Sequence, residues 1–184
     1  IMLVIDNFIK DRKFLDELKS EEFWRSVGQL NWWDGWWKSE PRNICEHFIK
    51  NVWKQFTNLE NKIAGFEYWS NIHEKGDGLN WHVDKDEKLS KEKKKIVMPN
   101  IGLVYYAISE ELEGGYLEIA NSPDRDNVDP NNIERLKPIE NRLIMFNPSF
   151  PHRVSGITNG KRRAIIVNAW TKKPYTFANS DRYP

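Results

Sequence analysis

Two histidines and one aspartate are the residues whose types and spacing best suit metal binding. His82 and Asp84 stand two positions apart, and His152 follows a Pro-Ser-Phe-Pro turn much further along the chain. On an extended strand, side chains at positions i and i+2 project from the same face, so His82 and Asp84 can converge on one ion. The pair alone is a weak signal, because the same spacing also suits a surface strand end with a local ion pair.

His152 strengthens the pattern. Two imidazoles and a carboxylate on one face of an octahedral ion form the facial triad of non-haem Fe(II) sites, which leaves coordination positions open. Arg162 comes just after the Asn159-Gly160 turn, where its guanidinium can bind a carboxylate through two parallel hydrogen bonds. Strand alternation puts Arg162 and Arg163 on opposite faces, and a shift of one residue in the register would exchange them.

The other two histidines are not expected to bind metal. His47 falls on an amphipathic helix, where we expect a partly buried imidazole, and His73 precedes the turn at 74–76, where we expect a solvated one.

The elements that position these residues change in character near Lys62. Before it, a short strand at 3–5 precedes two short helices broken near Ser20 and an amphipathic helix whose apolar stripe runs from Ile44 to Phe56. After it, β-rich runs separated by Gly, Pro, Asn and Asp turns indicate a sandwich or jelly roll. These runs are 63–72, 79–84, 96–108, 116–119, 142–147, 152–157 and 162–170.

Together, His82-x-Asp84, His152 and Gly160-x-Arg162 resemble the 2-oxoglutarate- and iron(II)-dependent dioxygenases, and most closely their prolyl 4-hydroxylase-like branch. Three further segments resemble strands and turns of that branch, namely 101–108, 113–119 and 142–154. The resemblance implies an α+β fold in which a double-stranded β-helix, an antiparallel jelly roll, is supported by N-terminal helices.

We therefore expect one dioxygenase domain over residues 1–184. Its helical support would span about 1–60 and its jelly roll about 62–170, followed by a polar, weakly structured tail at 171–184. The charged run at 85–95 is expected to be a solvated, mobile loop, and 121–132 an irregular surface excursion.

The resemblance also implies residue roles and cofactors. His82, Asp84 and His152 would bind Fe(II), and 2-oxoglutarate and O₂ would be co-substrates, with ascorbate as a further cofactor to consider. Arg162 would bind the distal carboxylate of 2-oxoglutarate with a tyrosine hydroxyl. Tyr106 is preferred for that contact over Tyr105, and Tyr68 is a second candidate contact whose position is offset from the family pattern.

The substrate is less specified. Hydroxylation of proline in a protein or peptide, with succinate and CO₂ as co-products, is the first prediction. Hydroxylation of a small molecule or free amino acid is the alternative, and a metal-free jelly roll that binds sugar or peptide is the alternative of another class. The tryptophans at 32–37 either pack beneath the barrel or form an aromatic platform for a proline-rich ligand.

Charge and composition argue against two partner classes. The formal net charge is +1, and Asn168 stands where nucleobase-demethylating relatives carry a second arginine, so no nucleic-acid partner is expected. No apolar run is long enough to cross a bilayer, so no membrane partner is expected. One cysteine, Cys45, and a first segment unlike a signal peptide predict a cytoplasmic location.

Overall fold

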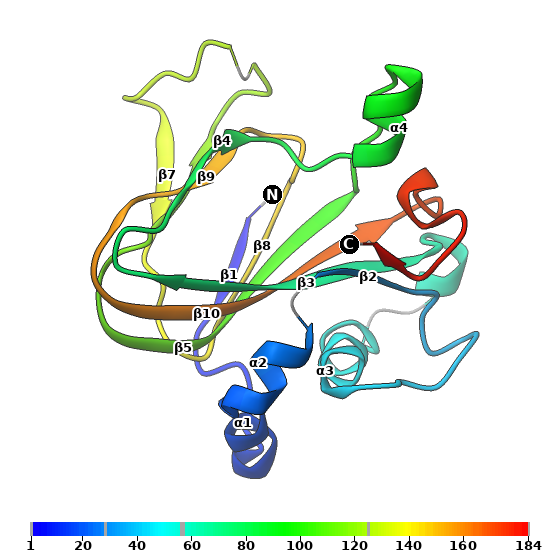
Figure 1. Cartoon of the computed structure of the whole chain (residues 1–184), viewed down its shortest axis with the longest axis horizontal. Helices are drawn as coiled ribbons and strands as arrows, with labels where there is room; N and C mark the ends of the chain where they lie inside the picture. The colour runs from blue at the N-terminus through cyan, green and yellow to red at the C-terminus, as the bar shows by residue number, and fades with distance from the viewer. Residues whose placement is uncertain (1, 28, 56–57, 125, 184) are drawn as a thin grey trace.

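The computed structural model describes residues 2–27, 29–55, 58–124 and 126–183. Two antiparallel sheets face each other, and helices cover the outer face of the larger one (Figure 1). The larger sheet has the order β1-β8-β5-β10-β3-β2-β11 and the smaller the order β4-β9-β6-β7. The larger sheet consists of β1 (Leu3–Ile5), β2 (Leu30–Trp33), β3 (Gly65–Glu74), β5 (Ile101–Gly114), β8 (Arg142–Phe146), β10 (Ile157–Trp170) and β11 (Arg182–Tyr183). The smaller sheet consists of β4 (Leu79–His82), β6 (Leu117–Ala120), β7 (Ile133–Leu136) and β9 (His152–Val154). The expected antiparallel jelly roll is confirmed.

The structure describes four α-helices, of which the first three were expected from the sequence. They are α1 (Arg12–Leu18), α2 (Glu21–Val27), α3 (Ile44–Trp53) and α4 (Glu87–Lys93), with short 3₁₀ turns at Leu59–Asn61 and Tyr175–Phe177. The Asp11 side chain accepts hydrogen bonds from two backbone N–H groups of α1, and Asn43 caps α3 in the same way. The apolar stripe of α3 is buried against the larger sheet, and Phe56, expected at its end, lies outside the described residues.

Alternation along β10 separates two cores. Ile165 and Val167 face the helices and belong to the large apolar cluster beneath the sheet. Ala164 and Ile166 face the smaller sheet and belong to a second cluster inside the barrel. A residue's parity along β10 therefore decides whether its side chain meets the helices or the barrel interior.

The tryptophans at 32–37 are packing residues. Trp33 is 1% exposed and belongs to the helix-side core, where Trp36 stacks on Phe66 with ring centroids 6.1 Å apart. Trp32 is buried in a small cluster with Trp170 and Phe177. The aromatic-platform interpretation is wrong, because Trp33, Trp36 and Trp37 pack between the helices and the sheet and Trp32 packs under the C-terminal segment.

Two segments are more ordered than the sequence suggested. The charged run at 85–95 contains α4, whose cap Asp86 accepts from the backbone N–H of Leu89 at 3.1 Å. The C-terminal tail forms a 3₁₀ turn and β11, and its Phe177 is fully buried. A segment of polar and charged residues can therefore form regular structure when a buried residue, here Asp86 or Phe177, anchors it to the rest of the protein. In contrast, the 121–132 excursion is irregular among its described residues, as expected.

Among the described residues, no helix combines the length and apolarity that a membrane span requires.

Candidate metal and co-substrate site

His82, Asp84 and His152 meet at the mouth of the barrel. His82 ends β4 and pairs directly with His152 on β9, so two neighbouring strands of the smaller sheet supply the imidazoles. The Nε2 atoms of His82 and His152 lie 3.7 Å and 3.6 Å from Oδ1 of Asp84. One candidate ligand atom from each residue lies within 4.8 Å of the others. These distances suit three donors grouped around one small divalent ion.

Both imidazoles have a fixed orientation. Nδ1 of His82 lies 2.8 Å from the carbonyl of Asn80, and Nδ1 of His152 lies 2.9 Å from that of Phe150. Because a carbonyl oxygen only accepts, each Nδ1 carries the proton and donates it. In the metal-bound state, this tautomer leaves the Nε2 lone pair of each neutral imidazole to the metal, which is the usual arrangement of metal-binding histidines. Without a metal, burial opposes the charge on His152, but the hydrogen bond and charge of Asp84 raise its pKa, so its Nε2 can carry a proton toward Asp84.

Asp84 is held as a carboxylate. Burial opposes its ionisation, but hydrogen bonding and charge from His152, with His82 beside it, hold the pKa of Asp84 below its usual value. Its other oxygen, Oδ2, accepts a hydrogen bond from Nδ2 of Asn168 at 3.0 Å. Asn168 therefore leaves Oδ1 to face both histidines.

The same amide group joins Asp84 to a second buried carboxyl. Nδ2 of Asn168 also donates to Oε1 of Glu67, at 3.2 Å. Burial, followed by the charge of Asp84, raises the pKa of Glu67 to about 8. Sequence reasoning missed Glu67; its signal is an acid in a strand whose neighbours are apolar or aromatic.

Arg162 lies deeper in the barrel and has no acidic partner among the described residues. Its side chain is 0% exposed, and its Nε and Nη2 atoms have no hydrogen-bond partner there. The guanidinium carbon sits 5.0 Å from the ring centroid of Tyr106, whose hydroxyl is also buried without a partner. A buried cation and a hydroxyl without partners call for an anion with hydrogen-bond acceptors.

Gly115 lies beside the Arg162 side chain, and Arg163 lies on the other face of the strand. Gly115 has a left-handed φ of 69°, and a Cβ there would lie 3.4 Å from Cδ of Arg162. Arg163 points to the other face of β10, where its Nη2 pairs with Glu74 at 3.1 Å. The residues present thus fit 2-oxoglutarate at Arg162 and a divalent metal at the triad.

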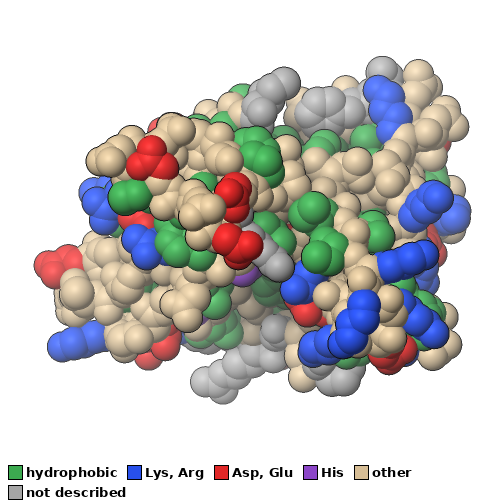
Figure 2. Space-filling view, turned by 90° about the horizontal axis from the view of Figure 1, so that it is seen from above, with side chains coloured by type: hydrophobic (Ala, Val, Ile, Leu, Met, Phe, Trp, Pro, Cys, Tyr) green, Lys and Arg blue, Asp and Glu red, His purple; other side chains and the backbone are tan. Residues whose placement is uncertain are grey.

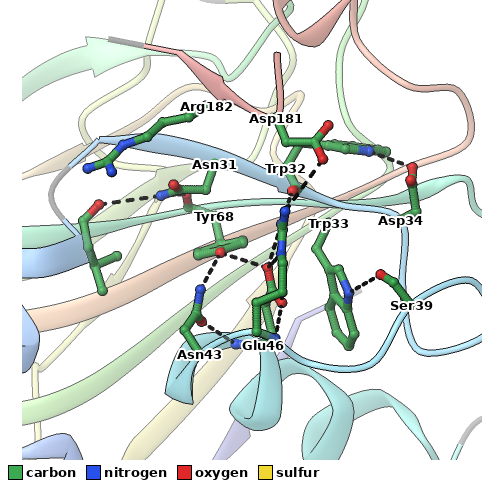
Figure 3. Close-up of polar contacts among 12 residues, drawn as sticks. Asn31, Trp32, Trp33, Asp34, Ser39, Asn43, Glu46, Tyr68, Asp181 and Arg182 are labelled. Carbon is green, nitrogen blue, oxygen red and sulfur yellow. Dashed lines mark hydrogen bonds and ion pairs between the residues drawn. The ribbon is translucent and has the colours of Figure 1, made fainter.

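Two tyrosines lie on the wrong face for this site. The Tyr68 hydroxyl donates to Glu46 at 2.9 Å and accepts from Asn43 at 2.8 Å, beneath the sheet beside α3 (Figure 3). It borders a separate cavity of about 570 Å³ on the helix side. Tyr105 also faces that side, and its hydroxyl donates to Asn141 at 2.9 Å. The expected Tyr68 contact is wrong, because Tyr68 pairs with Val167, a helix-side residue of β10.

The remaining histidines differ from each other. His47 is exposed on α3, so the expectation of a partly buried imidazole is wrong. His73 is not a solvated turn residue: it lies on β3 directly opposite Arg162, and its Nδ1 is 3.1 Å from Nη1 of Arg162. The expectation for His73 is wrong because β3 continues to Glu74, past the turn signal that seemed to end it.

A cavity of about 400 Å³ opens beside His82 and Asp84. Glu67 and Trp69 line it from β3 and Trp81 lines it from β4. Lys85, which follows Asp84, and Thr176 of the C-terminal segment complete the lining. Figure 2 shows a histidine in a depression near the centre of this face, with acidic and apolar side chains around it. A substrate can reach the triad through this opening.

A comparison with protein-family models connects this geometry to known proteins. The model described as 2OG-Fe(II) oxygenase superfamily matches residues 68–172, more than half of the chain. The chain belongs to the 2OG-Fe(II) oxygenase superfamily. It is therefore a dioxygenase that uses Fe(II), 2-oxoglutarate and O₂, and the metal-free binding-module alternative is set aside.

Solved structures show the same fold for this oxygenase at low sequence identity. A Pseudomonas putida prolyl-4-hydroxylase is 14% identical, with a TM-score of 0.61 over 94% of this chain and 88% of that chain. A viral collagen prolyl hydroxylase from Paramecium Bursaria Chlorella virus-1 is 16% identical, with a TM-score of 0.61 over 94% and 96%. A Trichoplax adhaerens prolyl hydroxylase in complex with a hypoxia inducible factor peptide fragment is 17% identical, with a TM-score of 0.63 over 97% and 87%. No curated protein matches the sequence.

Proposed function

We propose that this oxygenase hydroxylates proline in a protein or peptide, releasing succinate and CO₂. The observation that carries the proposal is the grouping of His82, Asp84 and His152 above a buried Arg162 whose Nε and Nη2 edge has no partner among the described residues. Support for a prolyl substrate comes from the structures with the same fold, three of which are prolyl hydroxylases by name.

Each residue has a defined task in this proposal. His82, Asp84 and His152 bind Fe(II) through Nε2, Oδ1 and Nε2. Arg162 and the Tyr106 hydroxyl bind the distal carboxylate of 2-oxoglutarate and so orient its keto-acid end toward the metal. When bound, Fe(II) supplies the activation of O₂: one oxygen atom enters succinate, the other is inserted into a substrate C–H bond, and CO₂ leaves.

The cavity supports a proline ring as the reacting group. Trp69 is partly buried, packs against the barrel core and lines the cavity that reaches His82 and Asp84. A saturated ring can pack on an indole face with little loss of conformational freedom, because proline has few rotamers to give up. A peptide would then run over the cavity mouth and place one proline near the triad.

Mass spectrometry of two substrate pools tests this proposal. The Fe(II)-loaded enzyme, with 2-oxoglutarate and O₂, is incubated separately with a proline-rich peptide library and with free amino acids. We expect the mass of one oxygen atom on proline in the peptide pool, and none with Asp84→Ala. A gain confined to free amino acids would contradict the peptide proposal and favour the small-molecule alternative.

A further inference from the structure

The polar contact that holds Arg162 in place comes from β3. Arg162 and His73 are directly opposed in the β10–β3 ladder, and Nη1 of Arg162 lies 3.1 Å from Nδ1 of His73. Arginine has only donors, so Nδ1 of His73 accepts this hydrogen bond. The Tyr106 ring, 5.0 Å away, contributes a flat surface but no hydrogen bond.

Two other arginines in the chain show how this side chain binds a carboxylate. Arg142 donates from Nε and Nη2 to Asp6, at 2.6 Å and 2.9 Å. Arg42 also uses Nε and Nη2 on Glu46: Nη2 donates to Oε1 at 2.7 Å, and Nε donates to Oε1 at 3.0 Å and to Oε2 at 3.3 Å. Both use the edge formed by Nε and Nη2, which matches the two oxygens of a carboxylate.

In Arg162 that same edge is buried and without a partner among the described residues, whereas Nη1 is occupied by His73. Nη1 of Arg162 therefore anchors the guanidinium to His73, and Nε and Nη2 remain available for a ligand. A guanidinium without the anchor could rotate about its last side-chain bonds and turn this edge away.

His73 is suited to accept because it is uncharged. Burial, followed by the nearby charge of Arg162, lowers the pKa of His73 to about 4, against an opposing effect of Asp77. A neutral imidazole presents a lone pair to the guanidinium, whereas a protonated one would repel it.

We propose that His73 is a positioning residue that anchors Nη1 of Arg162 and so aims its Nε and Nη2 edge at the distal carboxylate of 2-oxoglutarate. This inference rests on the proposed role of Arg162. His73 is not among the three candidate metal ligands, and the proposed effect acts through Arg162.

Calorimetric titration of 2-oxoglutarate into the Mn(II)-loaded protein tests the inference without turnover. We expect His73→Ala to weaken 2-oxoglutarate binding about tenfold, as losing a hydrogen bond to a charged group predicts. His73→Gln, whose amide oxygen can accept from Arg162, should recover most of that loss. His47→Ala, which changes an exposed histidine, is the matched control and should bind as the unchanged protein does. In turnover, His73→Ala should raise KM for 2-oxoglutarate with little change in kcat.

The variant Arg162→Ala distinguishes a failure of the positioning role of His73 from a failure of the proposed function. If Arg162→Ala loses 2-oxoglutarate binding while His73→Ala keeps it, the positioning role is overturned and the proposed function stands. A loss in His73→Ala that His73→Gln does not recover also overturns the hydrogen-bond role. If Arg162→Ala binds as tightly as the unchanged protein, both the proposed role of Arg162 and the inference fail.

Discussion

At the scale of single residues, the site depends on the side-chain amide of Asn168, which is not part of the His82-x-Asp84 and His152 pattern. Asn168 places one nitrogen between the carboxyls of Asp84 and Glu67, at 3.0 Å and 3.2 Å. This contact leaves Oδ1 of Asp84 toward the two imidazoles. Residues that orient a metal ligand in this way contribute to metal affinity although they do not touch the metal.

We predict that Asn168→Ala weakens Mn(II) binding by about 10- to 100-fold, because Asp84 loses the donor that orients it. Calorimetric titration of the metal into the metal-free protein measures this directly. Asn51→Ala, on the exposed face of α3, is the control. Equal metal affinity in Asn168→Ala and the unchanged protein would rule out the orienting role.

The raised pKa of Glu67 leads to a second prediction, which concerns the pH dependence of stability. The folded, metal-free protein raises the pKa of Glu67 from 4.5 to about 8, chiefly through burial and then through the charge of Asp84. Because the pKa of Glu67 is higher in the folded protein than in the unfolded chain, the protonated Glu67 stabilises the fold. This contribution to the free energy of unfolding is complete below about pH 4.5 and is lost as pH rises through about 8. Glu67→Gln should remove this loss, on the order of 4 kcal/mol in the free energy of unfolding between those limits.

Urea denaturation of the metal-free protein at a series of pH values from 5 to 8 measures the effect. Glu60→Gln, which changes an exposed glutamate, should keep the slope of the unchanged protein. If Glu67→Gln also keeps that slope, Glu67 does not retain its proton in the folded state.

The sequence was sufficient to predict that His82, Asp84 and His152 lie together, but it did not predict every contact. His82 and Asp84 share a strand end, so their spacing already placed them together, and the turn before His152 indicated a second strand. Tyr68 required knowledge of strand register, because its face is set by its pairing with Val167. Counting back from His82 across the 75–78 turn cannot supply that register.

At the scale of elements, sequence patterns missed β2, β7 and β11, although the equally short β1, β4, β6 and β9 were predicted. β2, β7 and β11 have four residues or fewer and owe their pairing to neighbours distant in sequence. The longer β-rich runs and α3 carry their own periodicity and were predicted. The helix α4 was missed because its composition is that of a solvated run, although Asp86 is a suitable cap.

Asp86 links α4 to the C-terminal segment. It is 2% exposed and accepts from the backbone N–H of Tyr175 and from both the backbone and the hydroxyl of Thr176. Asp86→Ala leaves these buried donors unpaired, so we predict a loss of about 3 kcal/mol in the free energy of unfolding, measured by urea denaturation.

Glu92→Ala is the matched control, because Glu92 is an exposed acid of the same helix that contacts the Tyr175 hydroxyl at 3.1 Å. It should cost less than about 1 kcal/mol, as exposed contacts do. Similar losses in the two variants would show that Asp86 is not the anchor.

At the scale of the whole molecule, one face of the larger sheet is used for support and the other for chemistry. The helices and the tryptophans at 33, 36 and 37 pack beneath it, whereas Arg162, Tyr106 and Glu67 point into the barrel.

Lys and Arg side chains gather at the end where α4 and the C-terminal segment lie (Figures 1 and 2). Cys45 is buried among the helix-side residues, and the cytoplasmic location stays a prediction.

The most direct test is an anaerobic spectroscopic titration. Fe(II) and then 2-oxoglutarate are added to the protein without O₂, and visible absorption is recorded. We expect a metal-to-ligand charge-transfer band that is absent in Asp84→Ala and requires more 2-oxoglutarate in Arg162→Ala. No band in the unchanged protein, or an undiminished band in Asp84→Ala, would contradict the assignment of His82, Asp84 and His152 as the iron ligands.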